Sequence, residues 1–139
     1  MNILHLLHIK SEVKYIYESN TLRQGLEKMR RYGYTAIPVI TEDGDYVGTV
    51  TEGDFLWHIL RNEKGSLKEQ EQYFVNDIVR DNFMEAVSVT ATAEELIEKA
   101  TNQNFVPVVD DRNKFIGIIT RRDIIKYFME KQTGKKDNV

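Results

Sequence analysis

The sequence contains no cysteine, and this absence removes several kinds of chemistry at once. Disulfide bonds, thiolate metal sites and a cysteine nucleophile are excluded, and the composition suits a reducing compartment such as the cytoplasm. No apolar run approaches the roughly 20 residues that a membrane-spanning helix needs. The first ten residues, MNILHLLHIK, lack the basic start and the cleavage site of a signal peptide, and we expect a short amphipathic helix there.

Other functional classes also lack support in the sequence. The net charge of −3 gives the chain no overall attraction for nucleic acid. No Gly-x-Ser-x-Gly, Walker loop or His-Glu-x-x-His motif is present, so an enzyme acting on a nucleotide is the least supported class. His5 and His8 have no third ligand nearby, and we expect no metal and no cofactor. A composition of 41% hydrophobic and 29% charged residues is typical of a soluble globular protein.

The chain has only two prolines, and they occupy the same position of an internal repeat. Residues 37–56 read IPVITEDGDYVGTVTEGDFL and residues 106–125 read VPVVDDRNKFIGIITRRDII. Four positions match at one offset of 69 residues: Pro38/Pro107, Gly48/Gly117, Thr51/Thr120 and Asp54/Asp123. A fixed-period repeat defines the architecture, and two like units related by a pseudo-dyad should form two related sites where they meet.

The hydrophobic pattern predicts the same elements in each half. In the first half we expect a strand near Tyr15–Tyr17, a helix from Thr21 to a stop at Gly33, strands at 36–40 and 46–50, and a helix near residues 55–60. In the second half we expect a helical turn at 76–79, strands at 86–89, 105–109 and 115–120, a helix at 92–100 with Leu96 and Ile97 facing inward, and a last helix from about residue 124.

This order gives an α/β (α+β) fold of two β-α-β-β-α repeats. We assign residues 1–60 to the first repeat, 61–72 to a polar linker, 73–130 to the second repeat and 131–139 to a polar tail. The first helices align at an offset of 71 rather than 69, so the first repeat has two extra residues around 32–35.

The repeated motif resembles the cystathionine-β-synthase (CBS) domain, used in tandem as a Bateman module. Its signature is a proline-containing strand followed by Gly-h-h-Thr-x-x-Asp at the junction of a strand and a helix, where h is apolar or small. Here it appears as GTVTEGD at 48–54 and GIITRRD at 117–123, and the resemblance covers about residues 10 to 130. The run at 33–38 together with Thr120-Arg121-Arg122 is also similar to bacterial CBS proteins that bind cyclic di-AMP.

Thr-x-x-Asp at a helix start is suited to a ribose phosphate. Free backbone N–H groups and the helix dipole favour an anion there, the threonine hydroxyl donates to a phosphate oxygen, and the aspartate accepts from a ribose diol. The same four residues also form a capping box that stabilises any helix. Arg121 and Arg122 make the Thr120 site the better expected anion binder than the Thr51 site, where Glu52 follows; alternatively, both arginines belong to a solvated helix face.

The resemblance implies that each adenine is held by the opposite repeat. The main site would comprise Lys14, Tyr15, Thr35, Ala36, Ile37, Thr120, Arg121, Arg122 and Asp123. The second, weaker site would comprise Thr51, Asp54, Glu85, Ala86, Asn104, Phe105 and Val106.

These residues lead to one main hypothesis and one rival. The main hypothesis is a stand-alone cytoplasmic regulator that binds AMP, ATP or cyclic di-AMP between its repeats and signals to an unidentified partner protein. The rival is a ligand-free dimerisation scaffold in which threonine and aspartate act only as caps. We also expect a homodimer formed through apolar helix surfaces, with candidates Leu56, Trp57, Leu60, Ile125 and Phe128.

Overall fold

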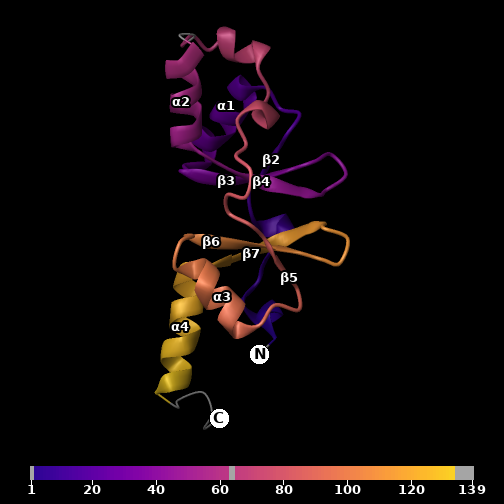
Figure 1. Ribbon diagram of the computed structural model, residues 1–139, viewed down its shortest axis with the longest axis vertical. Helices are drawn as coiled ribbons and strands as arrows, with labels where there is room; N and C mark the ends of the chain where they lie inside the picture. The colour runs from indigo at the N-terminus through magenta and orange to yellow at the C-terminus, as the bar shows by residue number, and fades with distance from the viewer. Residues whose placement is uncertain (1, 63–64, 134–139) are drawn as a thin grey trace.

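Two similar units stack end to end, with their sheets facing each other at the centre and their helices on the outside (Figure 1). The structure is a computed structural model that describes residues 2–62 and 65–133. The first unit contains β2 (Ile16–Tyr17), α1 (Leu22–Tyr32), β3 (Ala36–Ile40), β4 (Tyr46–Thr51) and α2 (Glu52–Asn62). The second contains β5 (Val87–Ser88), α3 (Ala93–Ala100), β6 (Phe105–Val109), β7 (Phe115–Thr120) and α4 (Arg121–Gln132). The expected order of two β-α-β-β-α repeats is confirmed.

Each repeat is built on an antiparallel hairpin of its two longer strands. The strand orders are β2-β3-β4 in one sheet and β1-β7-β6-β5 in the other, where β1 is His8–Ile9. Pro38 lies opposite Thr49, and Pro107 lies opposite Ile118. The register shifts between Val39 and Ile40 in one hairpin and at the equivalent step in the other. The two hairpins therefore share even the position of the register shift in their strand pairing.

The helices α1 and α3 begin where the sequence predicted, whereas α2 and α4 begin about one turn earlier than their apolar spacing indicated, at Glu52 and Arg121. Thr21 caps α1 in a full capping box with Gln24, and Gly33 ends the helix with φ of +72°. Thr120 caps α4 by accepting a hydrogen bond from the backbone N–H of Asp123 at 3.1 Å. The extra residues of the first repeat lengthen its helix, since α1 has 11 residues and α3 has 8. The loops before β3 and β6 consequently leave their helices at different points.

The two hydrophobic cores exchange segments across the boundaries drawn from the sequence. Ile3, from the N-terminal segment, is 1% exposed and packs in the core of the second repeat. Val75 and Ile78, which follow the linker, pack in the core of the first repeat. The exchange ties the repeats together, because neither core is complete without residues assigned to the other unit.

Several local expectations were wrong. The N-terminal segment forms a 3-10 helix, η1 (Ile3–Leu6), and then β1, because its backbone pairs with the free edge of β7. The linker contains a 3-10 helix, η3 (Glu69–Gln72), whose Gln70 is 1% exposed. By contrast, the helical turn expected at 76–79 is present as a 3-10 helix, η4 (Val75–Asp77). Ile97 is 44% exposed rather than inward. The polar tail expected at 131–139 begins as the end of α4, and residues 134–139 lie outside the described part of the chain.

The hairpin turns of the two repeats dock on each other through matched positions. The Phe115 N–H donates to the carbonyl of Gly44 at 2.9 Å, and the Tyr46 N–H donates to the carbonyl of Asn113 at 3.0 Å. These four residues are two pairs related by the 69-residue offset, so the bonds are reciprocal about a pseudo-dyad. Within the described ranges, no helix has the length and apolar character that crossing a bilayer requires.

Candidate functional site

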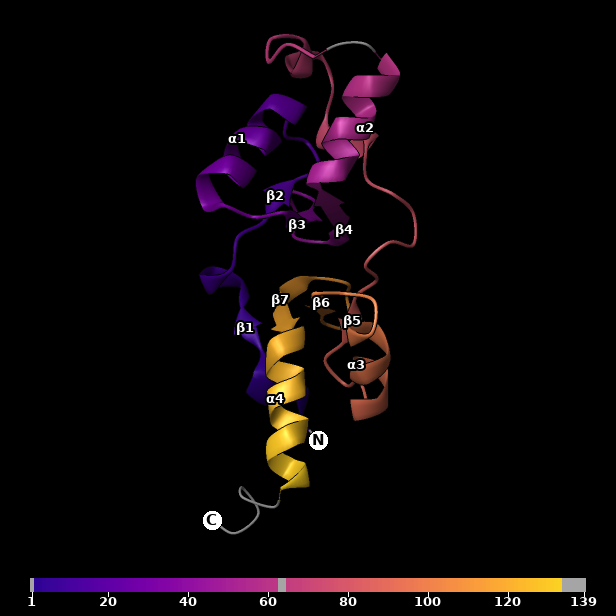
Figure 2. The same ribbon diagram turned by 90° about the vertical axis from the view of Figure 1, so that its left-hand side faces the viewer.

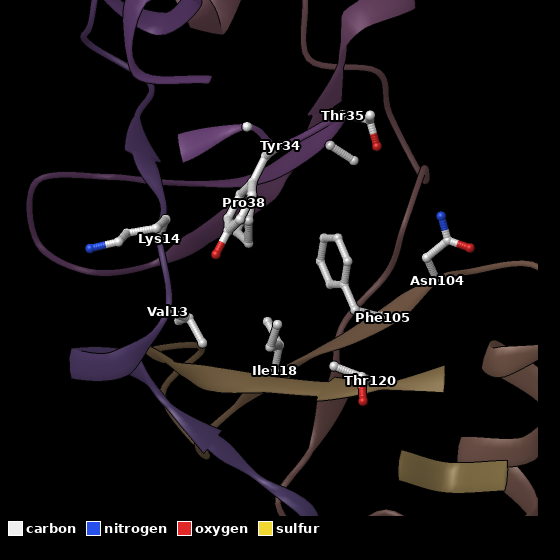
Figure 3. Close-up of a pocket in the computed structure, with 11 residues that line it drawn as sticks. Val13, Lys14, Tyr34, Thr35, Pro38, Asn104, Phe105, Ile118 and Thr120 are labelled. Carbon is white, nitrogen blue, oxygen red and sulfur yellow. The ribbon is translucent and has the colours of Figure 1, made fainter. Parts of the chain in front are cut away.

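A cleft of about 360 Å³ lies between the two repeats. Figure 3 shows side chains entering it from both repeats, with Tyr34 and Pro38 from the first repeat and Phe105 and Ile118 from the second. Its lining residues are Val13, Lys14, Gly33, Tyr34, Thr35, Ala36, Pro38, Asn104, Phe105, Ile118 and Thr120. Most of this surface is apolar, with a few polar groups at the edge, as in typical small-molecule sites.

The strand pairing explains why residues far apart in the sequence meet here. Phe105 and Thr120 are opposite each other in the β6–β7 pair, and Ala36 begins β3 in the facing sheet. Each proline strand is preceded by a loop that ends at the cleft. Val13 and Lys14 lie in the segment that passes from the second repeat to the first. The site is therefore a product of the stacking of the repeats.

Thr120 and Lys14 are two of the polar residues that line the cleft, together with Tyr34, Thr35 and Asn104. The Thr120 hydroxyl oxygen accepts the Asp123 N–H at the start of α4, and the hydroxyl also hydrogen-bonds the Asp123 carboxylate. The Lys14 ammonium group lies 5.0 Å from the centre of the Tyr32 ring, so its stem lines the cleft while its charge stays at the rim. The site thus combines an apolar interior, a helix N-terminus and one rim cation.

Asp123 faces away from the cleft toward the N-terminal segment. His8 Nε2 lies 2.6 Å from Asp123 Oδ2, and this hydrogen bond is the main reason why the pKa of Asp123 is below its usual value. The pair lines a separate hollow of about 300 Å³ that also includes His5, Lys126 and Glu130. Among the described residues, no group of three or more histidine and carboxylate side chains is close enough to hold a metal ion.

Arg121 does not reach the cleft. Its Nε donates to the carbonyl oxygens of Ala100 at 2.7 Å and Gln103 at 3.0 Å, which holds the side chain against the end of α3. Arg122 is exposed on the first turn of α4. The structure therefore does not bring the expected arginine pair together with Thr120.

The equivalent motif of the first repeat forms its own hollow of about 260 Å³, which includes Trp57 and Arg61. Asp54 is 8% exposed and lies 2.8 Å from Arg80 Nε, and it accepts hydrogen bonds from both the backbone N–H and the hydroxyl of Thr51. Arg80 in turn stacks at 3.6 Å on the ring of Phe83. The cations beside this motif, Arg61 and Arg80, were missed because they lie outside it in the sequence.

Most of the remaining sequence-predicted residues lie outside the cleft. Tyr15 contacts the rings of Tyr17 and Phe115, and Ile37 is fully buried in the first core. Glu85 pairs with Lys99 at 3.3 Å, Val106 is buried in the second core, and Ala86 does not line either motif's hollow. Asn104 and Phe105, which were assigned to the second site, line the same cleft as Thr120. The binding roles of all these residues stay predictions.

The chain belongs to the CBS domain family. The family model of the CBS domain matches it twice, at residues 6–61 and 75–130. It is 29% identical over 127 residues to the uncharacterized protein MJ1225 of Methanocaldococcus jannaschii, which covers 84% of this chain and 45% of that protein. The chain thus spans about half the length of the first curated relatives that it matches, or less.

Solved structures share this fold over nearly the whole chain. The crystal structure of CbpB in complex with c-di-AMP superposes with a TM-score of 0.87 at 24% identity, covering 100% of this chain and 91% of that one. The structure of CBSX2 in complex with AMP superposes with a TM-score of 0.71 at 21% identity, covering 94% and 98%. At these identities the likeness shows the fold.

Proposed function

We propose that this CBS pair binds one adenine nucleotide in the cleft between its repeats and acts as a non-catalytic cytoplasmic regulator that reports the nucleotide to a partner protein. The observation that carries the proposal is the cleft itself, where apolar walls from both sheets meet the N-terminus of α4. The two similar folds that were solved with c-di-AMP and with AMP support an adenine ligand.

The proposed pose follows from the chemistry of the walls. The rings of Tyr34 and Phe105 offer flat apolar surfaces for the adenine, one from each repeat. The phosphate would lie at the start of α4, where backbone N–H groups and the Thr120 hydroxyl favour an anion. At about 360 Å³ the cleft is at the lower end of the range for ligand pockets, which favours a mononucleotide as the occupant of one cleft.

The rival hypothesis, a ligand-free scaffold, also has a specific observation in its favour. Both motif aspartates already have partners within the chain, Asp54 with Arg80 and Asp123 with His8. A ribose diol would have to compete with those contacts. On this hypothesis Thr51 and Thr120 act only as helix caps.

Titration calorimetry with AMP, ATP, cyclic di-AMP, adenosine and GMP tests the two hypotheses. We expect saturable binding of at least one adenine nucleotide and weaker binding of GMP. Thr120→Val should weaken the phosphorylated ligands about tenfold, because it removes a donor to a charged group. Thr51→Val, at the equivalent position of the other repeat, is the matched control and should change the affinity little. An absence of binding by all five at millimolar concentration would favour the scaffold, and product analysis after incubation checks for nucleotide turnover.

A further inference from the structure

The two Thr-x-x-Asp motifs match in sequence, but their aspartates are held by partners of different kinds. Asp54 pairs with Arg80, whose Nε lies 2.8 Å from Asp54 Oδ1, whereas Asp123 pairs with His8. The side chain of Asp54 is 8% exposed and that of Asp123 is 34% exposed. An arginine is charged at every physiological pH, whereas a histidine is charged only when it is protonated. The first motif is therefore the more tightly occupied of the two.

Both carboxylate oxygens of Asp54 are engaged within the chain. Oδ1 faces Arg80, and Oδ2 accepts the backbone N–H of Thr51 at 2.8 Å and the Thr51 hydroxyl at 3.1 Å. A ribose diol needs a carboxylate that can accept two further hydrogen bonds. Because Asp54 is buried, a diol could reach it only by displacing one of these donors. Arg80 is the donor that can leave, since its side chain is 51% exposed, whereas Thr51 is fixed at the end of β4.

Arg80 also covers an aromatic ring. Its guanidinium carbon lies 3.6 Å from the centre of the Phe83 ring, which is the distance of a stacked cation. The guanidinium is planar, so it lies against a ring and pairs with a carboxylate at the same time. These are the two contacts that a nucleoside would need, a ring for its base and a carboxylate for its diol. The arginine therefore takes up both.

The segment that carries Arg80 is itself fixed in place. Figure 2 shows it running from beside α2 in the first repeat to β5 in the second. Asn82 and Met84 both have a φ of +57°, a conformation that is uncommon for residues other than glycine. Met84 is 8% exposed, and its carbonyl accepts the Tyr46 hydroxyl at 2.6 Å. These contacts hold the turn after Arg80 in one conformation.

The hollow that contains the Arg80–Asp54 pair is separate from the cleft. Thr51, Asp54 and Arg80 line the hollow of about 260 Å³, whereas Thr120 lines the cleft of about 360 Å³. Thr51 and Thr120 are related by the offset of 69, so a strict pseudo-dyad would give them equivalent surroundings. Arg80 is part of the difference between the two, because its side chain lines the first hollow.

We propose that Arg80 is an internal occupant of the first motif, which keeps the ribose diol of a nucleotide away from Asp54 and leaves the Thr120 motif as the one that binds. This inference rests on the proposed function, because it takes a nucleotide as the ligand. It adds the residue that decides which of two related sites is open. Removal of the arginine should therefore create a second nucleotide site.

Trp57 provides a signal for the first motif. It is the single tryptophan of the chain, it is 61% exposed, and it lines the hollow rather than the cleft. AMP is the probe, because it carries a free ribose diol. We expect AMP to leave the Trp57 emission of the native chain unchanged and to change that of Arg80→Ala. The affinity of AMP for the first motif should rise about tenfold or more, since a charged competitor is removed. Calorimetry should then count two sites per chain instead of one.

Three further variants test whether the new signal comes from Asp54. The double change Arg80→Ala/Asp54→Asn removes the charged acceptor and should lose most of the Trp57 response. His8→Ala, the corresponding change at the second motif, is the matched control and should give no Trp57 response. Arg80→Lys keeps a cation but not the planar group, so it should give a smaller gain than Arg80→Ala. It also keeps the test available if thermal unfolding shows that Arg80→Ala does not fold.

The outcomes separate this inference from the proposed function. If the native chain binds AMP at one site and neither Arg80 variant gives a Trp57 response up to millimolar AMP, the inference is wrong and the proposed function stands. A native chain that binds two AMP molecules with a Trp57 response also overturns the inference. If only the Arg80 variants bind AMP, the internal occupant is supported and the cleft is not the AMP site. If no protein of the series binds AMP, the inference falls.

Discussion

Asp45 and Lys114 occupy the same position of the two repeats, yet they pair with each other. Their side chains meet at 3.0 Å, and their backbones form an isolated antiparallel bridge. Two residues that are equivalent under a two-fold axis and also in contact lie on either side of that axis and next to it. One residue has become acidic and the other basic, so the contact that would repel in an identical pair is attractive.

The axial position makes this pair open to a charge-swap test. Asp45→Lys/Lys114→Asp exchanges the charges across the pseudo-dyad and should leave the free energy of unfolding within about 0.5 kcal/mol of native, because each side chain moves to an equivalent place. Lys114→Asp alone puts two acids together and should cost about 1 kcal/mol, since the pair is partly exposed. Urea unfolding of the three proteins measures both quantities. Equal losses in the single and double variants would contradict the axial placement.

Gly117 is the point where the N-terminal strand approaches β7 most closely. Its φ is +153°, and a Cβ atom there would fall on the carbonyl oxygen of His8. Gly117→Ala should therefore displace β1 and lower the free energy of unfolding by about 2–4 kcal/mol. Gly33→Ala is the matched control, because its φ is +72° but no atom lies within 4 Å of the added Cβ, and it should cost only about 1 kcal/mol. Amide exchange at His8 and Ile9 would show whether the strand has left the sheet.

Arg121 and Arg122 are adjacent but should behave differently. Arg121→Ala removes two hydrogen bonds from a charged group to the end of α3 and should cost about 2 kcal/mol of stability. Arg122→Ala should leave stability within about 0.5 kcal/mol, because the side chain is exposed. If Arg122 contacts a ligand phosphate, its loss weakens AMP but not adenosine, and that selectivity should decline at high salt. A phosphate selectivity that depends on Arg121 would contradict its structural role.

His58 should make the stability of the chain depend on pH. It is 6% exposed, and burial together with nearby Arg61 holds its pKa below the usual value despite the opposing charge of Asp77. The unfolded chain takes up a proton at higher pH than the folded one, so stability is greatest above about pH 6.5 and falls as the pH drops through the folded pKa. Thermal unfolding between pH 7.5 and pH 5 should show this loss, which should be smaller in His58→Gln. An unchanged slope in that variant would assign the effect to another group.

The sequence predicted the elements well because their determinants are local. Thr21, Thr92 and Thr120 cap helices through residues three positions away, and Gly33 ends a helix through its own backbone. The lower accuracy at the N-terminus has a physical cause. The apolar spacing of residues 3–9 fits a short helix, but pairing with the edge of β7 satisfies more backbone groups than an isolated helix of that length.

The directions of charged side chains were not predictable in the same way. Asp54 pairs with Arg80, and Asp123 pairs with a histidine 115 residues away, so each partner depends on the path of the chain. Arg121 was correctly noted as a cation beside Thr120. Its direction was decided by two carbonyl groups at the end of α3, which no spacing within the motif reveals. Some residues that the sequence assigned to the main site do line the cleft, such as Lys14 and Thr35. Their backbone is positioned by the repeat itself.

The loop formed by Gly33, Tyr34 and Thr35 lines both the inter-repeat cleft and a separate hollow between α1 and α2. A ligand and a second copy of the chain would therefore each bias the conformation of one short segment. Thermodynamic linkage then requires reciprocity: the factor by which a nucleotide changes the dimer dissociation constant is the factor by which dimerisation changes the nucleotide affinity. If the chain binds both, its response would depend on its own concentration as well as on that of the ligand.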